Sequence, residues 1–264
     1  MRVRSFLNSS YPSVKLTDLL TSARARLRDY ALRMLPAVDD ERRLKGVVTR
    51  TTILALSSTR SNALVRDVVD NPKLVFRMNE DLRKAYEAMI EFDEWFVPVV
   101  NDTTGKYVGV LTLDRYLKEV LASESRVHSI NVSEFMSEEV IYFMEDDPVS
   151  KVWRKMMETG FGGFPVVKGK KEFVVGIITQ HDLLKKGYTR IELESEGGPR
   201  HGPKVKEAMT SPAITVKATS TLKEAISLML RHDVGRLPVV RDDGSLAGII
   251  DRSDAVRAYL PHLL

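Results

Sequence analysis

The chain has 264 residues, 43% of them hydrophobic and 29% charged, which is typical of a soluble globular protein. The net charge of +4 is spread along the whole chain, which does not favour a nucleic-acid-binding protein. There is no cysteine, which excludes disulfide bonds and thiolate metal sites, and the five histidines lack metal-ligand spacing. No apolar run approaches the ~18 residues of a membrane span, and the first five residues lack the apolar core of a signal peptide. We therefore expect a cytoplasmic protein without membrane association.

A five-residue segment that begins with valine opens each of four repeats. The four segments start at Val3, Val65, Val132 and Val205. After each segment comes a short apolar run, such as residues 140–142 or 213–216, which predicts a β-strand. Repeats of this length decide the fold and are therefore the first feature to interpret.

An amphipathic helix follows in each repeat. The predicted helices open at Leu20, Leu82, Val149 and Leu222. Apolar residues recur three and seven positions later, which marks one face of a helix. Thr221, with Glu224 three residues on, predicts a capping box. The methionines at the seventh position are expected in the core, because methionine fills irregular gaps.

Two apolar runs come next and predict a β-hairpin. A proline lies 16 residues after each helix opener, and a glycine in the second run follows it by 10 or 11 residues. In the third repeat the turn between the runs is Lys168-Gly169-Lys170-Lys171. A second helix closes each repeat, so that every unit has the order β-α-β-β-α and the fold class is α+β.

The second helix of the third repeat begins around Thr179 and Asp182. A helix N-terminus carries unpaired N–H groups and the positive end of the helix dipole, which favours an anion. One of the two residues is expected to cap the helix and the other to contact a ligand hydroxyl. For Asp182, and for Asp254 at the same position of the fourth repeat, capping and ligand contact both remain open.

The repeats divide the chain into four predicted domains. We place them at residues 1–62, 63–128, 129–190 and 204–264, with a linker at residues 191–203. The linker is polar and contains glycine and proline, which predicts a mobile connection.

These four registered units resemble cystathionine-β-synthase (CBS) domains. The resemblance covers nearly the whole chain. The pattern is similar to that of the γ subunit of AMP-activated kinase and of stand-alone archaeal four-CBS proteins. It implies that the units pair into two Bateman modules arranged as a disc. It also implies a non-catalytic sensor with no required cofactor, which binds AMP, ADP or ATP in the clefts between paired units. S-adenosylmethionine is a less favoured ligand, and the regulated protein partner remains unknown.

The resemblance implies two clefts in the C-terminal module. The first combines Thr179, Gln180, His181 and Asp182 with Thr210, Ala213, Ile214, Gly235 and Arg236. The second combines Asp251, Arg252, Ser253 and Asp254 with Ser137, Val140, Ile141, Gly162 and Gly163. The aspartates are expected to bind ribose hydroxyls, and Arg236 a phosphate, because a guanidinium presents forked donors. Gly162 and Gly163 are expected to leave room for a ligand.

The N-terminal module departs from this pattern. Thr52 and Arg115 stand where the family has aspartate, and Arg33-Met34 and Trp95-Phe96 are bulky enough to plug the clefts. We therefore expect nucleotide chiefly in the C-terminal module. The alternative is a scaffold or nucleic-acid-associated protein that uses the basic first unit, and a homodimer remains open.

Overall fold

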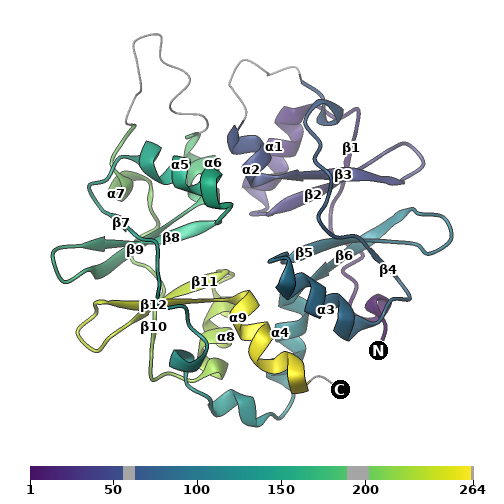
Figure 1. The fold of residues 1–264 in the computed structure, drawn as a ribbon. Helices are drawn as coiled ribbons and strands as arrows, with labels where there is room; N and C mark the ends of the chain where they lie inside the picture. Colours follow the sequence, from purple (N-terminus) through teal and green to yellow (C-terminus); the bar gives the residue numbers. More distant parts are fainter. Residues whose placement is uncertain (56–62, 189–201, 263–264) are drawn as a thin grey trace.

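The structure is a computed structural model that describes residues 1–55, 63–188 and 202–262. Four units of the same build occupy the four quarters of a disc (Figure 1). The α+β fold expected from the repeats is confirmed. The predicted linker at residues 191–203 lies almost wholly outside the described residues.

The first two units form the N-terminal module. Unit 1 contains β1 (Val14–Lys15), α1 (Leu20–Asp29), β2 (Met34–Val38), β3 (Leu44–Thr49) and α2 (Arg50–Ala55). Unit 2 contains β4 (Phe76–Arg77), α3 (Leu82–Glu91), β5 (Phe96–Val100), β6 (Tyr107–Thr112) and α4 (Leu113–Ala122). Short 3₁₀ turns open them at η1 (Val3–Ser5) and η2 (Val65–Asp67), and η3 (Arg126–Ser129) follows α4.

The last two units form the C-terminal module. Unit 3 contains η4 (Val132–Glu134), β7 (Phe143–Met144), α5 (Val149–Thr159), β8 (Gly163–Lys168), β9 (Phe173–Thr179) and α6 (Gln180–Lys186). Unit 4 contains α7 (Val205–Ala208), β10 (Val216–Lys217), α8 (Leu222–Arg231), β11 (Arg236–Val240), β12 (Leu246–Asp251), α9 (Arg252–Tyr259) and η5 (Leu260–His262).

Each unit has a three-stranded mixed sheet, in which the first strand is parallel to the second and the second is antiparallel to the third. The first strand is shorter and later than predicted. In unit 3 it is Phe143–Met144, paired with Val166 and Val167, and the predicted run at residues 140–142 is a loop. The parallel pairing covers only Phe143 and Met144, and of these two residues only Phe143 is buried. In unit 4 the predicted strand at 213–216 likewise begins at the buried Val216, where the two-residue parallel pairing starts.

The predicted helix starts are confirmed at Leu20, Leu82, Val149 and Leu222. Thr221 and Glu224 form the predicted capping box. The methionines of the repeat lie in the core with no exposed surface: Met89, Met156 and Met229. Within the described part of the chain, no helix combines the length and apolarity needed to cross a bilayer.

Within each module the opening segment of one unit pairs with the last strand of the other. Thr210 pairs with Ile177 of β9, and Ser137 pairs with Ile249 of β12. The N-terminal module repeats this exchange with Asp70 and Val47. Each cleft is therefore built from both units of a pair.

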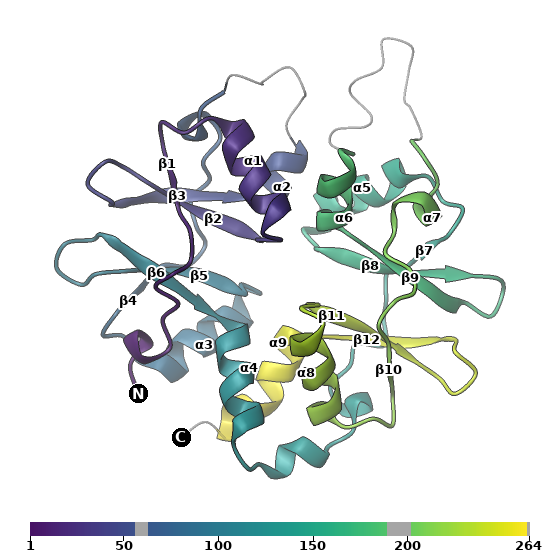
Figure 2. The same cartoon turned by 180° about the vertical axis from the view of Figure 1, so that it is seen from behind.

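Helices at the end of the repeats join the two modules. Helix α2 of unit 1 packs against α6 of unit 3, and α4 of unit 2 packs against α9 of unit 4 (Figure 2). Trp153 Nε1 donates a hydrogen bond to the Leu54 carbonyl oxygen across this junction at 3.1 Å. The largest hydrophobic cluster continues from unit 2 into unit 4 and includes Tyr116 and Tyr259. The two modules are thus joined by packed helices and by a shared hydrophobic core.

Candidate functional site

A cavity of about 320 Å³ lies between units 3 and 4, and residues of unit 1 close its inner side. Its volume is at the lower end of the roughly 300–1,000 Å³ of small-molecule sites. The structure brings together here nine of the predicted residues, namely Thr179, His181, Asp182, Thr210, Ile214, Gly235, Arg236, Gly162 and Arg252. The first seven come from the first predicted cleft, so that most of this cleft is present as a continuous surface.

The Asp182 carboxylate lines the cavity. Its Oδ2 accepts hydrogen bonds from the backbone N–H of Thr179 at 2.8 Å and from the Thr179 hydroxyl at 2.6 Å. The Thr179 hydroxyl accepts in turn from the Asp182 N–H at 3.1 Å. Both residues therefore cap the helix, where the sequence had assigned the cap to one of them. Asp182 Oδ1 accepts from the Thr210 hydroxyl at 2.8 Å and joins the two units.

His181 is the second polar side chain of unit 3 in this cavity. Its Nδ1 is buried and has no hydrogen-bond partner among the described residues. Burial lowers the pKa of His181, and the nearby Arg50 lowers this pKa further. The imidazole is therefore neutral at neutral pH, and a ligand can satisfy its free nitrogen.

Arginines from two units, unit 1 and unit 4, gather in the cavity. Arg33, Arg50 and Arg236 all line it. Arg33 stacks on Trp95 at 3.6 Å from the ring centroid, and Arg236 lies 5.5 Å from the same centroid. Burial lowers the pKa of Arg33, and repulsion by Arg236 and Arg252 lowers this pKa further. An anion bound between these guanidiniums would relieve that repulsion.

Two residues predicted for the first cleft do not line this cavity. Gln180 points toward unit 1, where its Nε2 donates to the Thr51 hydroxyl at 3.1 Å. It lines the N-terminal cavity instead, because α6 packs against α2. Ala213 is half-buried beside the cleft but does not face the cavity.

The second predicted cleft is largely occupied by contacts between the modules. Arg252 is 4% exposed and forms ion pairs with Asp114 at 2.9 Å and with Asp233 at 3.2 Å. The Ser253 hydroxyl donates to Asp93 at 2.9 Å. These two side chains therefore connect unit 4 to unit 2, a role that the sequence did not indicate.

Asp254 is held within its own unit. Its Oδ2 accepts from the Asp251 N–H at 3.0 Å, and its Oδ1 lies 3.2 Å from Arg257. Burial raises the pKa of Asp254 to about 7, and the adjacent Asp251 contributes to this rise. The Asp251 side chain caps the helix through the N–H groups of Ser253 and Asp254.

The remaining residues predicted for the second cleft do not gather around Asp254. Ser137 pairs through its backbone with Ile249, and Ile141 is 37% exposed. Asp254 lines neither this cavity nor the larger one in the N-terminal module, and the same holds for Ser137, Val140 and Ile141.

The two residues of the predicted glycine pair differ in their surroundings. A Cβ at Gly163 would lie 2.9 Å from Thr179 of the adjacent strand, so the space there is used for strand pairing. Gly162 lines both cavities and faces the guanidiniums of Arg236 and Arg33.

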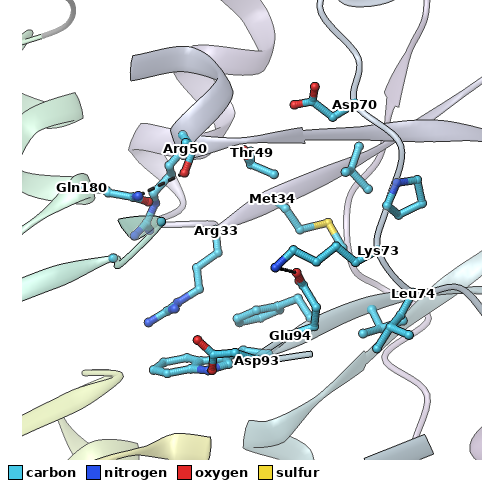
Figure 3. Close-up of a pocket in the computed structure, with 18 of the residues that line it drawn as sticks. Arg33, Met34, Thr49, Arg50, Asp70, Lys73, Leu74, Asp93, Glu94 and Gln180 are labelled. Atoms are coloured by element: carbon cyan, nitrogen blue, oxygen red, sulfur yellow. Dashed lines mark hydrogen bonds and ion pairs between the residues drawn. The ribbon is translucent and has the colours of Figure 1, made fainter. Parts of the chain in front are cut away.

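A larger cavity of about 610 Å³ lies in the N-terminal module (Figure 3). The expectation that Arg33 and Trp95 plug this module is wrong. The two side chains stack on each other and reach toward the disc centre, where both lie against Gly235. The sequence marked both positions as bulky but gave no sign of their direction, because their partner lies in another module.

The fold and the clefts define a protein of four tandem β-α-β-β-α units paired into two modules. The CBS domain family matches four segments of the chain, at residues 3–58, 65–122, 132–188 and 205–261. The chain therefore belongs to the CBS-domain family.

Two archaeal proteins match this chain along nearly their whole length. MJ1225 of Methanocaldococcus jannaschii is 23% identical over 277 residues, with 96% of each chain covered. Its crystal structure, from a protein proposed to be an archaeal homolog of g-AMPK, superposes with a TM-score of 0.84 over 98% of this chain and 100% of that one, at 22% identity. A conserved protein of Pyrococcus horikoshii superposes with a TM-score of 0.65 over 97% and 99% of the two chains, at 23% identity.

MJ1404 of Methanocaldococcus jannaschii is 30% identical over 175 residues. The match covers 64% of this chain but only 41% of MJ1404. The chain thus corresponds to part of that relative and to nearly all of MJ1225.

Proposed function

We propose that this protein is a non-catalytic sensor that binds AMP, ADP or ATP in the cavity between units 3 and 4 and transmits occupancy to a protein partner. The observation that carries the proposal is that one cavity holds both a carboxylate with a hydroxyl and a group of arginines. Asp182 and Thr210 line it together with Arg33, Arg50 and Arg236.

These two sets of side chains suit the two polar parts of a nucleotide. A carboxylate accepts hydrogen bonds from the vicinal hydroxyls of a ribose, and guanidiniums donate paired hydrogen bonds to phosphate oxygens. The same cavity offers apolar surface to a base through Ile214, Val234 and Phe96. Membership of the CBS-domain family supports an adenosine ligand, and no chemistry on the ligand is proposed.

Signalling requires that the ligand prefer one of two states of the protein, because equal affinity for both shifts nothing. The inner wall of the cavity comes from unit 1, so the bound phosphate would lie between the two modules. We propose that occupancy changes the packing of α2 against α6, which a partner then reads. The same structure with and without nucleotide would contradict this part.

Calorimetric titration tests the ligand. We expect one of AMP, ADP, ATP and S-adenosylmethionine to bind clearly more tightly than the others, and Asp182→Ala to weaken that binding by at least tenfold. Asp81→Ala is the matched control, because Asp81 also caps a helix, through the Lys84 N–H at 3.1 Å, but lines neither cavity. Unchanged binding in Asp182→Ala would overturn the assignment. No binding of any of the four would favour the scaffold alternative.

A further inference from the structure

The N-terminal cavity occupies the position in units 1 and 2 that the smaller cavity occupies in units 3 and 4. Asp70, Lys73 and Leu74 line it from the segment that opens unit 2, just as Thr210 and Ile214 line the other cavity from the segment that opens unit 4. Thr49 corresponds to Thr179. Its volume of about 610 Å³ against about 320 Å³ leaves room for a larger ligand.

The carboxylate missing from unit 1 is supplied by unit 2. In the C-terminal module, Asp182 of unit 3 accepts a hydrogen bond from Thr210 of unit 4. In the N-terminal module the same two positions hold Thr52 and Asp70, and the Thr52 hydroxyl donates to Asp70 Oδ2 at 2.6 Å. The acid and the hydroxyl have exchanged places. In the C-terminal module the first unit of the pair supplies the carboxylate, and in the N-terminal module the second unit supplies it.

Asp70 is also freer to bind a ligand than Asp182. Asp182 uses Oδ2 for the helix cap, whereas in unit 1 the hydroxyls of Thr49 and Thr52, 2.8 Å apart, form the corresponding contact. Asp70 Oδ1 has no hydrogen-bond partner among the described residues, and Asp70 is exposed. It is therefore available to ribose hydroxyls.

Cations lie across the cavity from Asp70. Figure 3 shows Arg33 and Arg50 beside Gln180 on one side, with Asp70 and Lys73 on the other. Within the described residues Arg33 forms no ion pair with a carboxylate, and its guanidinium stacks on the Trp95 ring and lies against Gly235. An anion is the missing partner of this buried cation.

The other two acids in the cavity are already engaged. Glu94 pairs with Lys73 at 3.0 Å, and Asp93 accepts from Ser253 and from Trp95 Nε1 at 3.1 Å. Four cationic side chains, namely Arg33, Arg50, Lys73 and Arg236, face three carboxylates, namely Asp70, Asp93 and Glu94. The remaining positive charge lies at the arginines, which favours phosphate there.

We propose that this cavity is a second nucleotide site, which takes a ribonucleoside di- or triphosphate with its ribose on Asp70 and its phosphates on Arg33 and Arg50. The assignment rests on the proposed function of the C-terminal cavity and extends it to a module that lacks the family aspartate. The larger volume and the unpaired Arg33 account for the preference for more than one phosphate.

The test uses calorimetric titration of the full chain with AMP, ADP and ATP. We expect two sites in the wild type. Asp70→Asn should weaken binding of ADP or ATP at one site by at least tenfold, and Asp182→Asn should weaken chiefly the other, because the two cavities share Arg33, Arg50 and Arg236 but not the two aspartates. Binding in Asp70→Asn that matches the wild type at both sites would overturn the proposal. A single site that Asp182→Asn abolishes would do the same.

A restored pair separates ligand contact from folding. Asp70→Thr should lose the second site, and the double variant Thr52→Asp/Asp70→Thr should regain it, because it copies the arrangement of Asp182 and Thr210. Circular dichroism and thermal melting would establish that each variant is folded. A folded double variant without the second site overturns the proposal. Absence of all nucleotide binding in the wild type is a different result, because it removes the proposed function itself.

Discussion

The Arg33 guanidinium lies 3.6 Å from the centroid of the Trp95 ring, and both side chains press on Gly235 of the opposite module. A Cβ at Gly235 would lie 2.3 Å from Arg33 Nη2 and 2.4 Å from Trp95 Cζ3. This contact fixes how the modules meet and where the arginines point. It also leads to the first prediction.

Gly235→Ala should destabilise the protein by about 1–3 kcal/mol, because the buried Trp95 ring cannot move aside without disturbing the core. Gly162→Ala is the matched control at the same position of unit 3. Its nearest atoms are 3.6 and 3.8 Å from the added Cβ, so the change should stay within about 0.5 kcal/mol. Urea unfolding measures both. Equal effects would show that the contact at Gly235 is not tight.

Arg252→Ala should lower the free energy of unfolding by about 3 kcal/mol, because it leaves Asp114 without the cation that pairs with it in a buried setting. Arg83→Ala serves as the control, since Arg83 and Glu87 form an exposed pair on one helix and should contribute at most about 0.5 kcal/mol. Denaturant unfolding distinguishes the two. If Arg252→Ala costs no more than Arg83→Ala, the central ion pairs do not hold the modules together.

Arg236→Ala should weaken AMP binding by about tenfold and leave adenosine binding unchanged, because a guanidinium–phosphate hydrogen bond contributes about 1.5–3 kcal/mol. Arg241→Ala is the control in the same hairpin. Arg241 donates to the Leu246 carbonyl oxygen and lines neither cavity. Calorimetry with both ligands gives the comparison. Parallel losses for AMP and adenosine would mean that Arg236 supports the cavity and does not contact phosphate.

Because of Asp254, the free energy of unfolding should fall as the pH rises from about 4 to 7. Burial raises the pKa of Asp254 from 3.8 to about 7, so in this range the folded protein keeps a proton that the unfolded chain has lost. The free energy of unfolding then falls with pH by up to about 1.4 kcal/mol per pH unit.

Asp254→Asn tests this, because the amide cannot ionise. The difference in stability between wild type and variant, followed by thermal unfolding between pH 4 and 8, should change across the window and level off above it. A difference that stays constant with pH would mean that the carboxyl is ionised throughout.

The repeat itself can be predicted from the sequence. The helix starts, the hairpins and the core methionines each depend on neighbours within one unit, so the spacing of apolar residues is enough to predict them. The first strands were placed too early, because a two-residue parallel pair leaves almost no pattern in the sequence.

Contacts between the two modules could not be predicted from the repeat pattern. Gln180, Arg252 and Ser253 follow strands at equivalent positions, and the repeat assigned them all to ligand. In the structure each reaches across to the N-terminal half, because α6 and α9 pack against α2 and α4. The pairing of Thr52 with Asp70 was missed for a related reason, since it requires comparing a helix start with the opening segment of the next unit.

Arg33 and Trp95 stand at the position that Gly162 and Gly235 hold in the other half, three residues before the repeat proline. Two large side chains of the N-terminal module thus pack where the C-terminal module has two glycines. A disc made of two first halves would force two stacked pairs into the space of one, and a disc made of two second halves would leave that space empty. The chain is in this sense a covalently joined heterodimer, whose halves share one fold yet cannot replace each other.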